Sequence, residues 1–466
     1  MVFSSIVFMF LYLPIVLAVY YLSPWRFRNV WLFAVNLVFY GWGEPVYLFL
    51  MLFSITINYI AGAMVGKHRL TCPRKAKLWL AGNTVVNLGM LFFFKYYDLV
   101  ASSLSMIPGV TVPTMGLELP IGISFYTFQT MSYPIDVYRG DADVQRNYIS
   151  FGTFVALFPQ LIAGPIVRYK DVASQLAFRA GSVDQFASGV QRFTVGLAKK
   201  VLLANNLGML WDVYGSQGPE LTTLGAWIGA TGFALQLYFD FSGYSDMAIG
   251  LGRMLGFEFL ENFNYPYISK SVTEFWRRWH ISLGTWFRDY VYIPLGGNRK
   301  GPVRHLLNIL IVWALTGFWH GASWTFMLWG LYSAVLLILE KFIYGRYLKK
   351  GFGAAVGVLY TNVAMICSWP LFNLAQLDLC ETYYKAMFGM GANGLVSSMD
   401  LYYLRSFAVI LLVGVIASLP WGKQLYHKLS TKWKGILSPV LILLVLVLST
   451  AYLVDATYNP FLYFRF

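Results

Sequence analysis

Charged residues are scarce in this sequence. Only 12% of the 466 residues are Asp, Glu, Lys or Arg, whereas a soluble protein carries about 25%. Hydrophobic residues make up 58%, and several apolar runs exceed the ~20 residues that are needed to cross a bilayer. A soluble globular protein is therefore excluded, and we predict an all-α polytopic membrane protein with about nine to twelve transmembrane or re-entrant helices.

Cysteine is rare, and several catalytic motifs are missing. Cys72, Cys367 and Cys380 are the only cysteines and form no CxxC pair, so we predict neither a zinc site nor a disulfide framework. The chain has no Walker A loop, no GxSxG elbow and no HExxH motif. These absences argue against a P-loop nucleotide hydrolase, a serine hydrolase and a zinc protease, and no metal ion is expected.

No basic residue precedes the first apolar run, and no long polar linker interrupts the chain. Because a secretory signal begins with a basic segment, Ile6–Leu22 is predicted to be an uncleaved first membrane helix. We predict that residues 1–466 form one transmembrane domain with a catalytic core at about 118–340. In that core, Leu119–Phe125 and Phe158–Pro165 are rich in Pro and Gly, which is tolerated at membrane depth only inside protein or along a cavity.

The formal net charge of +14 would indicate nucleic-acid binding in a soluble protein. Here the basic residues lie in short loops between apolar runs, for example in Lys67–Arg69 and Arg74–Lys77. This pattern is typical of the positive-inside rule. We therefore attribute the charge to membrane topology and lipid headgroups and expect no nucleic acid as a partner. An anionic coenzyme could still use some of these residues.

One histidine lies in a long apolar run. Leu306–Leu339 is 34 residues long and has no Asp, Glu, Lys or Arg, and His320 lies near its middle. A single helix of that length would extend ~51 Å, whereas the bilayer core is ~30 Å thick. We therefore predict a break at Gly317–Gly321, which would put the imidazole at a helix end inside the protein. The alternative is a buried histidine that only hydrogen-bonds a neighbouring helix.

A second histidine, His280, ends the aromatic and basic segment Glu274–His280. The segment is amphipathic and too polar to span a membrane. We predict an interfacial or re-entrant helix that begins near residue 273 and is capped by Ser271 or Thr273. Trp276 and His280 would then lie on one helix face, at positions i and i+4. A hydrated histidine beside interfacial arginines is the alternative.

Asp240 and Asp246 place two carboxylates in an apolar segment, where each needs a partner. They could pair with Arg253 or with the pair Arg277 and Arg278, or they could orient a histidine. Structural pairing is the favoured interpretation.

Tryptophan is concentrated around the two histidines, since seven of the sixteen tryptophans lie in 276–329. They could form an aromatic belt at the membrane interface, or they could line a tunnel for a lipid-like or pantetheine-like chain. The sequence leaves both possibilities open. No internal repeat is evident, which argues against a transporter built from paired halves.

Several longer strings carry a family resemblance. They are Met1–Ser5, Leu119–Phe128, Phe158–Pro165, Tyr238–Ala248, Glu274–Leu283, Gly317–Ala322 and Tyr458–Phe464. Together they resemble the membrane-bound O-acyltransferase family over almost the whole chain. The similarity is to its bacterial branch, which acetylates polysaccharides such as alginate and cellulose.

The resemblance implies acyl transfer inside a ring of helices around a central funnel or tunnel. It implies acetyl-CoA as the donor on the cytoplasmic side and no metal. The acetyl group would then pass outward, to a periplasmic acetyltransferase partner or towards an exopolysaccharide, with alginate and cellulose both left open. The implied location is the bacterial cytoplasmic (inner) membrane.

The resemblance also assigns the site. The family's catalytic histidine falls on His320, and its second active-site polar position falls on His280. We interpret His320 as the general base, because an imidazole with a pKa of ~6.5 can accept a hydroxyl proton at neutral pH, and His280 as a residue that positions or polarises a reactant. Substrate or cofactor binding is predicted for Trp276, Arg277, Arg278, Trp319, Asp240 and Asp246.

Two other functions stay open at this stage. A transporter could move an acyl donor or a glycan without making covalent bonds. A non-catalytic scaffold could recruit a periplasmic acetyltransferase.

Overall fold

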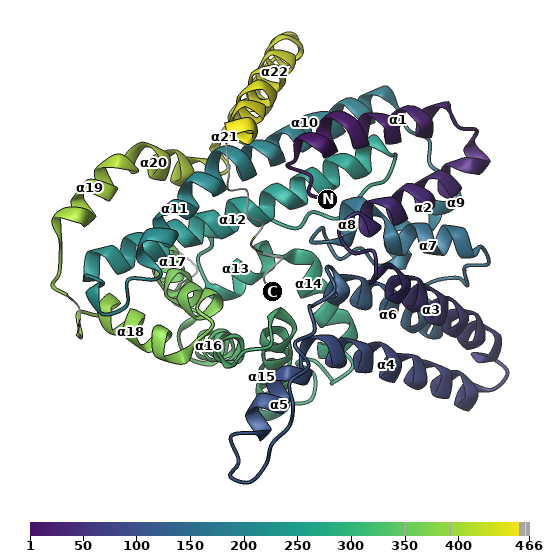
Figure 1. Ribbon diagram of the computed structural model, residues 1–466, viewed down its shortest axis with the longest axis horizontal. Coiled ribbons are helices and arrows are strands. Elements are labelled where there is room, and N and C mark those ends of the chain that lie inside the picture. The colour runs from purple at the N-terminus through teal and green to yellow at the C-terminus, as the bar shows by residue number, and fades with distance from the viewer. Residues whose placement is uncertain (349–350, 392, 456–461, 463–466) are drawn as a thin grey trace. The chain divides into compact units, whose positions relative to one another are not determined.

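Helices make up most of the described chain, as the computed structural model shows (Figure 1). The structure describes residues 1–348, 351–391, 393–455 and 462. Those residues contain helices and no strand, which confirms the all-α prediction. Of the strings that carry the family resemblance, Tyr458–Phe464 lies outside the described residues except for Leu462.

The chain forms two compact units. The first combines residues 1–193 with 244–260, and the second combines residues 194–243 with 261–466. The long helix α12, Thr223–Met254, contributes to both. The sequence-based assignment of a single domain with a core at about 118–340 stays a prediction.

The first unit contains the N-terminal helices. They are η1 (Phe8–Tyr12), α1 (Leu13–Leu22), α2 (Trp25–Gly41), α3 (Leu48–His68), α4 (Pro73–Lys95), α5 (Tyr97–Leu104), α6 (Ile123–Arg139), α7 (Tyr148–Ala156), α8 (Phe158–Leu161), α9 (Tyr169–Ala177) and most of α10 (Val183–Ala198). Helices α3, α4 and α6 lie side by side (Figure 1).

Buried amides connect two of these helices. Asn83 and Asn58 are joined by a hydrogen bond of 2.9 Å, and Asn58 also donates to Asn87 at 3.0 Å. Asn58 belongs to α3 and the other two belong to α4. Because a bilayer core offers no water, such side chains must satisfy one another inside the protein.

The second unit contains the remaining helices. They are η2 (Lys199–Ala204), α11 (Asn205–Tyr214), η3 (Gly218–Glu220), η4 (Pro266–Ile268), α13 (Val272–Arg278), α14 (Ile281–Phe287), η5 (Arg288–Tyr292), α15 (Pro302–His320), α16 (Trp324–Leu339), η6 (Glu340–Tyr344), α17 (Phe352–Asn373), α18 (Leu377–Met387), α19 (Ser398–Ser406), α20 (Ala408–Ala417), α21 (Trp421–Lys428) and α22 (Thr431–Asp455). Its core is rich in aromatic side chains, among them Phe239, Phe275, Trp279, Trp329 and Trp369.

Several helices are suited to a bilayer. Among the described residues, five stretches are long and apolar enough to cross a membrane: Leu48–His68, Pro73–Lys95, Trp324–Tyr344, Phe352–Asn373 and Thr431–Asp455. Helices α19 and α20, bent by 55° at their junction, would add a sixth if they form one broken span. The multi-pass membrane class is thereby confirmed, whereas the count of about nine to twelve transmembrane or re-entrant helices stays a prediction.

Candidate active site

His320 is the last residue of α15. The next residue, Gly321, has extended backbone with φ −169°, and α16 begins at Trp324. The predicted break of the long apolar run is therefore confirmed. His320 is only 5% exposed, so its imidazole lies at a helix end inside the second unit.

Two glycines allow α15 and α16 to pack closely. A Cβ on Gly317 would clash with the carbonyl oxygen of Phe326, and a Cβ on Gly330 would clash with the carbonyl oxygen of Trp313. A side-chain rotation cannot relieve either clash, because both involve backbone atoms. Since Gly317 lies one helical turn before His320, this packing sets where the imidazole is placed.

Gly317→Ala should therefore lower the free energy of unfolding by about 1–3 kcal/mol, as overpacking does in other cores. Thermal unfolding of the purified chain in detergent measures the effect. Gly89→Ala is the matched control, because it also lies in an apolar helix and its added Cβ would meet nothing within 4 Å. Equal unfolding temperatures for the two variants would contradict the packing argument.

His280 lies between two short helices rather than inside one. Helix α13 ends at Arg278 and α14 begins at Ile281, and His280 has a left-handed backbone with φ 45°. The prediction of one continuous helix with Trp276 and His280 on the same face is therefore wrong. A residue at positive φ cannot continue a right-handed helix.

The start of α13 is fixed by polar side chains. Ser271 caps the helix, as predicted, and accepts a hydrogen bond from the Glu274 backbone N–H at 3.1 Å. The carboxylate of Glu340 accepts the backbone N–H groups of Val272 at 2.7 Å and of Thr273 at 3.2 Å. A buried carboxylate at a helix N-terminus is favourable because of the helix dipole. Helix α13 is thereby held against η6.

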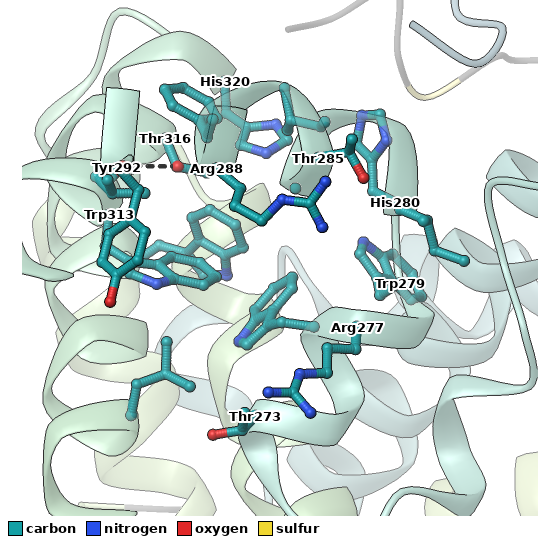
Figure 2. A pocket seen from close by; sticks show the side chains of 18 residues that line it. Thr273, Arg277, Trp279, His280, Thr285, Arg288, Tyr292, Trp313, Thr316 and His320 are labelled. Atoms are coloured by element: carbon teal, nitrogen blue, oxygen red, sulfur yellow. Dashed lines mark hydrogen bonds between the residues drawn. The ribbon is translucent and has the colours of Figure 1, made fainter. Parts of the chain in front are cut away.

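Both histidines line one pocket of about 550 Å³ in the second unit (Figure 2). The lining residues are Thr273, Trp276, Arg277, Trp279, His280, Ile281, Leu283, Gly284, Thr285, Phe287, Arg288, Tyr292, Val312, Trp313, Thr316, His320, Trp329 and Leu337. None of these lining residues is Asp or Glu, and two are arginines. The pocket is therefore lined by aromatic rings and by two guanidinium groups, those of Arg277 and Arg288.

Aromatic rings pack against both imidazoles. The Trp319 ring lies with its centroid 5.0 Å from that of His320 and 6.1 Å from that of His280, so one indole lies beside both. Trp319 itself is not among the lining residues. The His320 ring also meets Trp329 at 5.0 Å and Phe372 at 5.1 Å, both edge to face. These contacts fix the orientation of the His320 ring.

His280 is held by a buried amide. Its Nδ1 lies 3.1 Å from Oδ1 of Asn262, and its ring packs edge to face on Phe241 with centroids 4.7 Å apart. Burial lowers the pKa of His280 well below its usual value, because the charged imidazolium loses hydration. The ring is therefore neutral at pH 7.

The structure separates the predicted basic and aromatic binding residues. Trp276 and Arg277 line the pocket, whereas Arg278 does not. The guanidinium of Arg278 donates to the Glu274 carboxylate at 2.9 Å and to the backbone carbonyl of Asn264 at 3.0 Å. Arg278 thus stabilises the loop that leads into α13.

Asp240 and Asp246 lie on α12, and neither is among the pocket-lining residues. In the second unit, Asp240 pairs with Lys200, with Nζ 2.6 Å from Oδ1. In the first unit, Asp246 pairs with Arg192, with Nη2 2.6 Å from Oδ1. Structural pairing is confirmed, but these partners differ from the arginines that the sequence suggested. They come from η2 and α10, distant segments that pack along α12.

The sequence interpretation missed several residues of the site, among them three polar lining residues and one residue behind the pocket. Thr285, Arg288 and Thr316 line the pocket, and Asn262 holds His280 from behind. In Figure 2, Arg288 extends into the pocket on the side of His320, and its Nε lies 2.7 Å from the Asp289 carboxylate. A basic residue shortly after His280 in an aromatic segment was a usable signal for Arg288. No local signal marked Thr285, Thr316 or Asn262.

The chain is similar to known proteins over its full length. The profile of the membrane-bound O-acyltransferase family matches residues 141–375, which include every pocket-lining residue. A probable alginate O-acetylase AlgI from Pseudomonas putida is 41% identical over 494 residues and covers 100% of both chains. Another from Pseudomonas aeruginosa is 45% identical over 84% of this chain and 75% of its own. A peptidoglycan O-acetyltransferase from Helicobacter pylori is 29% identical over 100% of this chain and 98% of its own.

Proposed function

This chain belongs to the membrane-bound O-acyltransferase family and is thus an O-acyltransferase, and from this premise we propose that it transfers acetyl from cytoplasmic acetyl-CoA to an exported polysaccharide, with His320 as general base. One observation carries the proposal. Two histidines 40 residues apart in the sequence line a single pocket whose lining residues include two arginines and no carboxylate.

Acetyl transfer from a thioester to a hydroxyl requires two things from the protein, a base and a binding site. A thioester is already activated, so the step that needs catalysis is removal of the proton from the attacking hydroxyl. A ring nitrogen of His320 accepts that proton while the hydroxyl oxygen attacks the acetyl carbon. The ester C–O bond forms as the C–S bond breaks, and the proton leaves with the thiol of the coenzyme. The imidazole is then ready for another turnover.

The walls of the pocket suit the donor. A volume of about 550 Å³ falls in the usual range for small-molecule sites of about 300–1,000 Å³. Trp276 and Trp313 form an aromatic wall, with ring centroids 4.7 Å apart, for a pantetheine chain. Arg277 and Arg288 would meet the phosphates, since guanidinium groups bind phosphate through paired hydrogen bonds.

The acceptor is inferred from the relatives. Those named above are described as acting on alginate and on peptidoglycan, both of which are polymers of sugars. We propose an exopolysaccharide acceptor, alginate or cellulose, reached directly or through a periplasmic acetyltransferase partner. The corresponding location is the bacterial inner membrane, and the catalytic core would lie at about 118–340.

The donor site can be tested by removing one charge. Arg277→Gln should raise KM for acetyl-CoA by roughly ten- to hundredfold, the value of a hydrogen bond to a charged group. It should leave KM for S-acetylpantetheine unchanged, because that donor carries no phosphate. Arg278→Gln is the matched control, since its guanidinium bonds outside the pocket lining. A similar rise in KM for both donors would remove Arg277 from phosphate binding.

The proposed function as a whole can be tested with the full chain in lipid nanodiscs. Acetyl-CoA and oligosaccharides of alginate or cellulose are added, and free thiol and acetyl esters are measured. We expect thiol release that depends on the acceptor, together with new esters. Uptake of acetyl-CoA without ester formation would indicate a transporter. A folded chain that releases no thiol, although cells that carry it acetylate their polymer, would indicate a scaffold.

A further inference from the structure

Three groups lie within hydrogen-bond distance of the side-chain oxygen of Asn262. It lies 3.1 Å from Nδ1 of His280, 3.2 Å from the backbone nitrogen of Ser282 and 2.8 Å from Oγ of Ser282. All three residues are buried, with exposed fractions of 0% for Asn262, 3% for His280 and 2% for Ser282. The network therefore sits behind the pocket, in protein rather than in solvent.

The backbone N–H of Ser282 determines the orientation of the Asn262 side-chain amide. A backbone N–H can only donate, so the atom of Asn262 that it approaches must be the oxygen and not the NH₂ group. That oxygen can only accept. The Nδ1 atom of neutral His280 must therefore carry the hydrogen of this bond, and Nε2 must carry the lone pair.

The backbone holds this arrangement in place. The Ile281 N–H donates to the carbonyl of Asn262 at 2.9 Å, and the Asn264 N–H donates to the carbonyl of Arg278 at 2.9 Å. These two bonds bracket His280, whose backbone is left-handed with φ 45°. A non-glycine residue persists in that conformation only where its surroundings impose it. The strained backbone turns the Nδ1 edge of the ring towards Asn262.

We infer that Asn262 is a positioning residue that fixes neutral His280 as its Nδ1–H tautomer, so that Nε2 meets the substrate as a hydrogen-bond acceptor. Asn262 is not among the lining residues, whereas His280 is, so the amide holds the ring from outside the pocket. This inference rests on the proposed function. It also excludes one role for His280, namely hydrogen-bond donation to the thioester oxygen. A ring nitrogen that carries a lone pair has no hydrogen to donate.

The inference specifies the class of acceptor. A hydroxyl has one hydrogen, so the hydroxyl that loses its proton to His320 cannot also donate to His280. A sugar ring offers a second hydroxyl on the neighbouring carbon. Nε2 of His280 then accepts a hydrogen bond from that neighbour and orients the reacting hydroxyl. The site should therefore prefer acceptors with vicinal hydroxyls over simple alcohols.

The test compares two acceptors with one donor. Asn262→Leu should lower kcat/KM with a methyl glycoside that has vicinal hydroxyls by about 10- to 100-fold, the loss known for partners that orient a metal-ligating histidine. With the corresponding deoxy glycoside, which lacks the neighbouring hydroxyl, the same substitution should change kcat/KM by less than about threefold, because the interaction that Asn262 supports is already absent. Asn264→Leu is the matched control, because its side chain is exposed and lies two residues away.

A second variant distinguishes loss of this hydrogen bond from misfolding of the chain. Asn262→Asp keeps an acceptor for Nδ1–H and should retain the preference for vicinal hydroxyls. Its carboxylate should raise the pKa of His280, so Nε2 becomes protonated at higher pH and activity is lost earlier as the pH falls. The neighbours that face His280 from α12 and α15 are the uncharged Phe241 and Trp319, and the charged lining residues Arg277 and Arg288 are unchanged in all variants.

Equal losses with both acceptors, or an Asn262→Asp variant with a wild-type acid limb, would overturn the inference. Failure of the proposed function looks different, because then the wild-type chain itself would not transfer acetyl to either glycoside.

Discussion

Replacing His320 by Gln should reduce acetyl transfer by about 10²–10⁴-fold, the usual contribution of a general base. Gln is close to His in size and keeps hydrogen-bonding atoms, but it cannot take up a proton near neutral pH. The ring lies at the end of α15 and is packed by Trp319, Trp329 and Phe372, so the backbone should keep its place. Acetyl esters on the polymer of living cells, together with thiol release by the purified chain, measure the loss.

His305→Gln is the matched control for this prediction. His305 lies on the same helix, but it packs on Tyr292 and Phe342 and does not line the pocket. It should therefore retain wild-type transfer at equal membrane abundance. Full acetylation by His320→Gln would take His320 out of the chemistry and favour a scaffold. Loss of acetylation by both variants would point to a damaged helix.

The buried pair of Lys200 and Asp240 should have the largest effect on stability. Its two side chains are only 3% and 2% exposed, and Asp240 also accepts the backbone N–H of Leu462 at 3.0 Å. Lys200→Met leaves the carboxylate without its cation in an apolar surrounding. We expect a loss of about 3–5 kcal/mol in the free energy of unfolding, measured by thermal or denaturant unfolding in detergent.

Two further variants separate this explanation from others. The double variant Lys200→Met with Asp240→Leu should regain most of the lost stability, because no uncompensated charge remains buried. Lys385→Met breaks a pair with Glu381 whose side chains are 55% and 66% exposed, and it should change stability by less than about 1 kcal/mol. A Lys200→Met chain of normal stability that has lost acetyl transfer would instead assign Asp240 to substrate binding, as the sequence first suggested.

The site was predictable in part. The two histidines were visible because a polar residue in a long apolar run is unusual wherever the chain later folds. Arg277 and Arg278 looked equivalent in sequence, but successive side chains leave a helix in different directions, so Arg277 lines the pocket and Arg278 pairs with Glu274. The predicted helix is correct as far as Arg278, where α13 ends. The left-handed backbone at His280 had no local signal, since glycine is the usual residue there.

The sequence by itself determined the class of protein, the helical segments and the break of the apolar run at His320. Those features depend on hydropathy and on the length of a helix against the thickness of a bilayer, and both are local properties of the chain. Only the tertiary structure determined which buried polar side chains pair with one another. Asp240 meets Lys200, and His280 meets Asn262, because packing brings together segments that the sequence keeps apart. Hydrogen bonds and ion pairs act over a few ångströms, so their partners are set by where the helices come to lie.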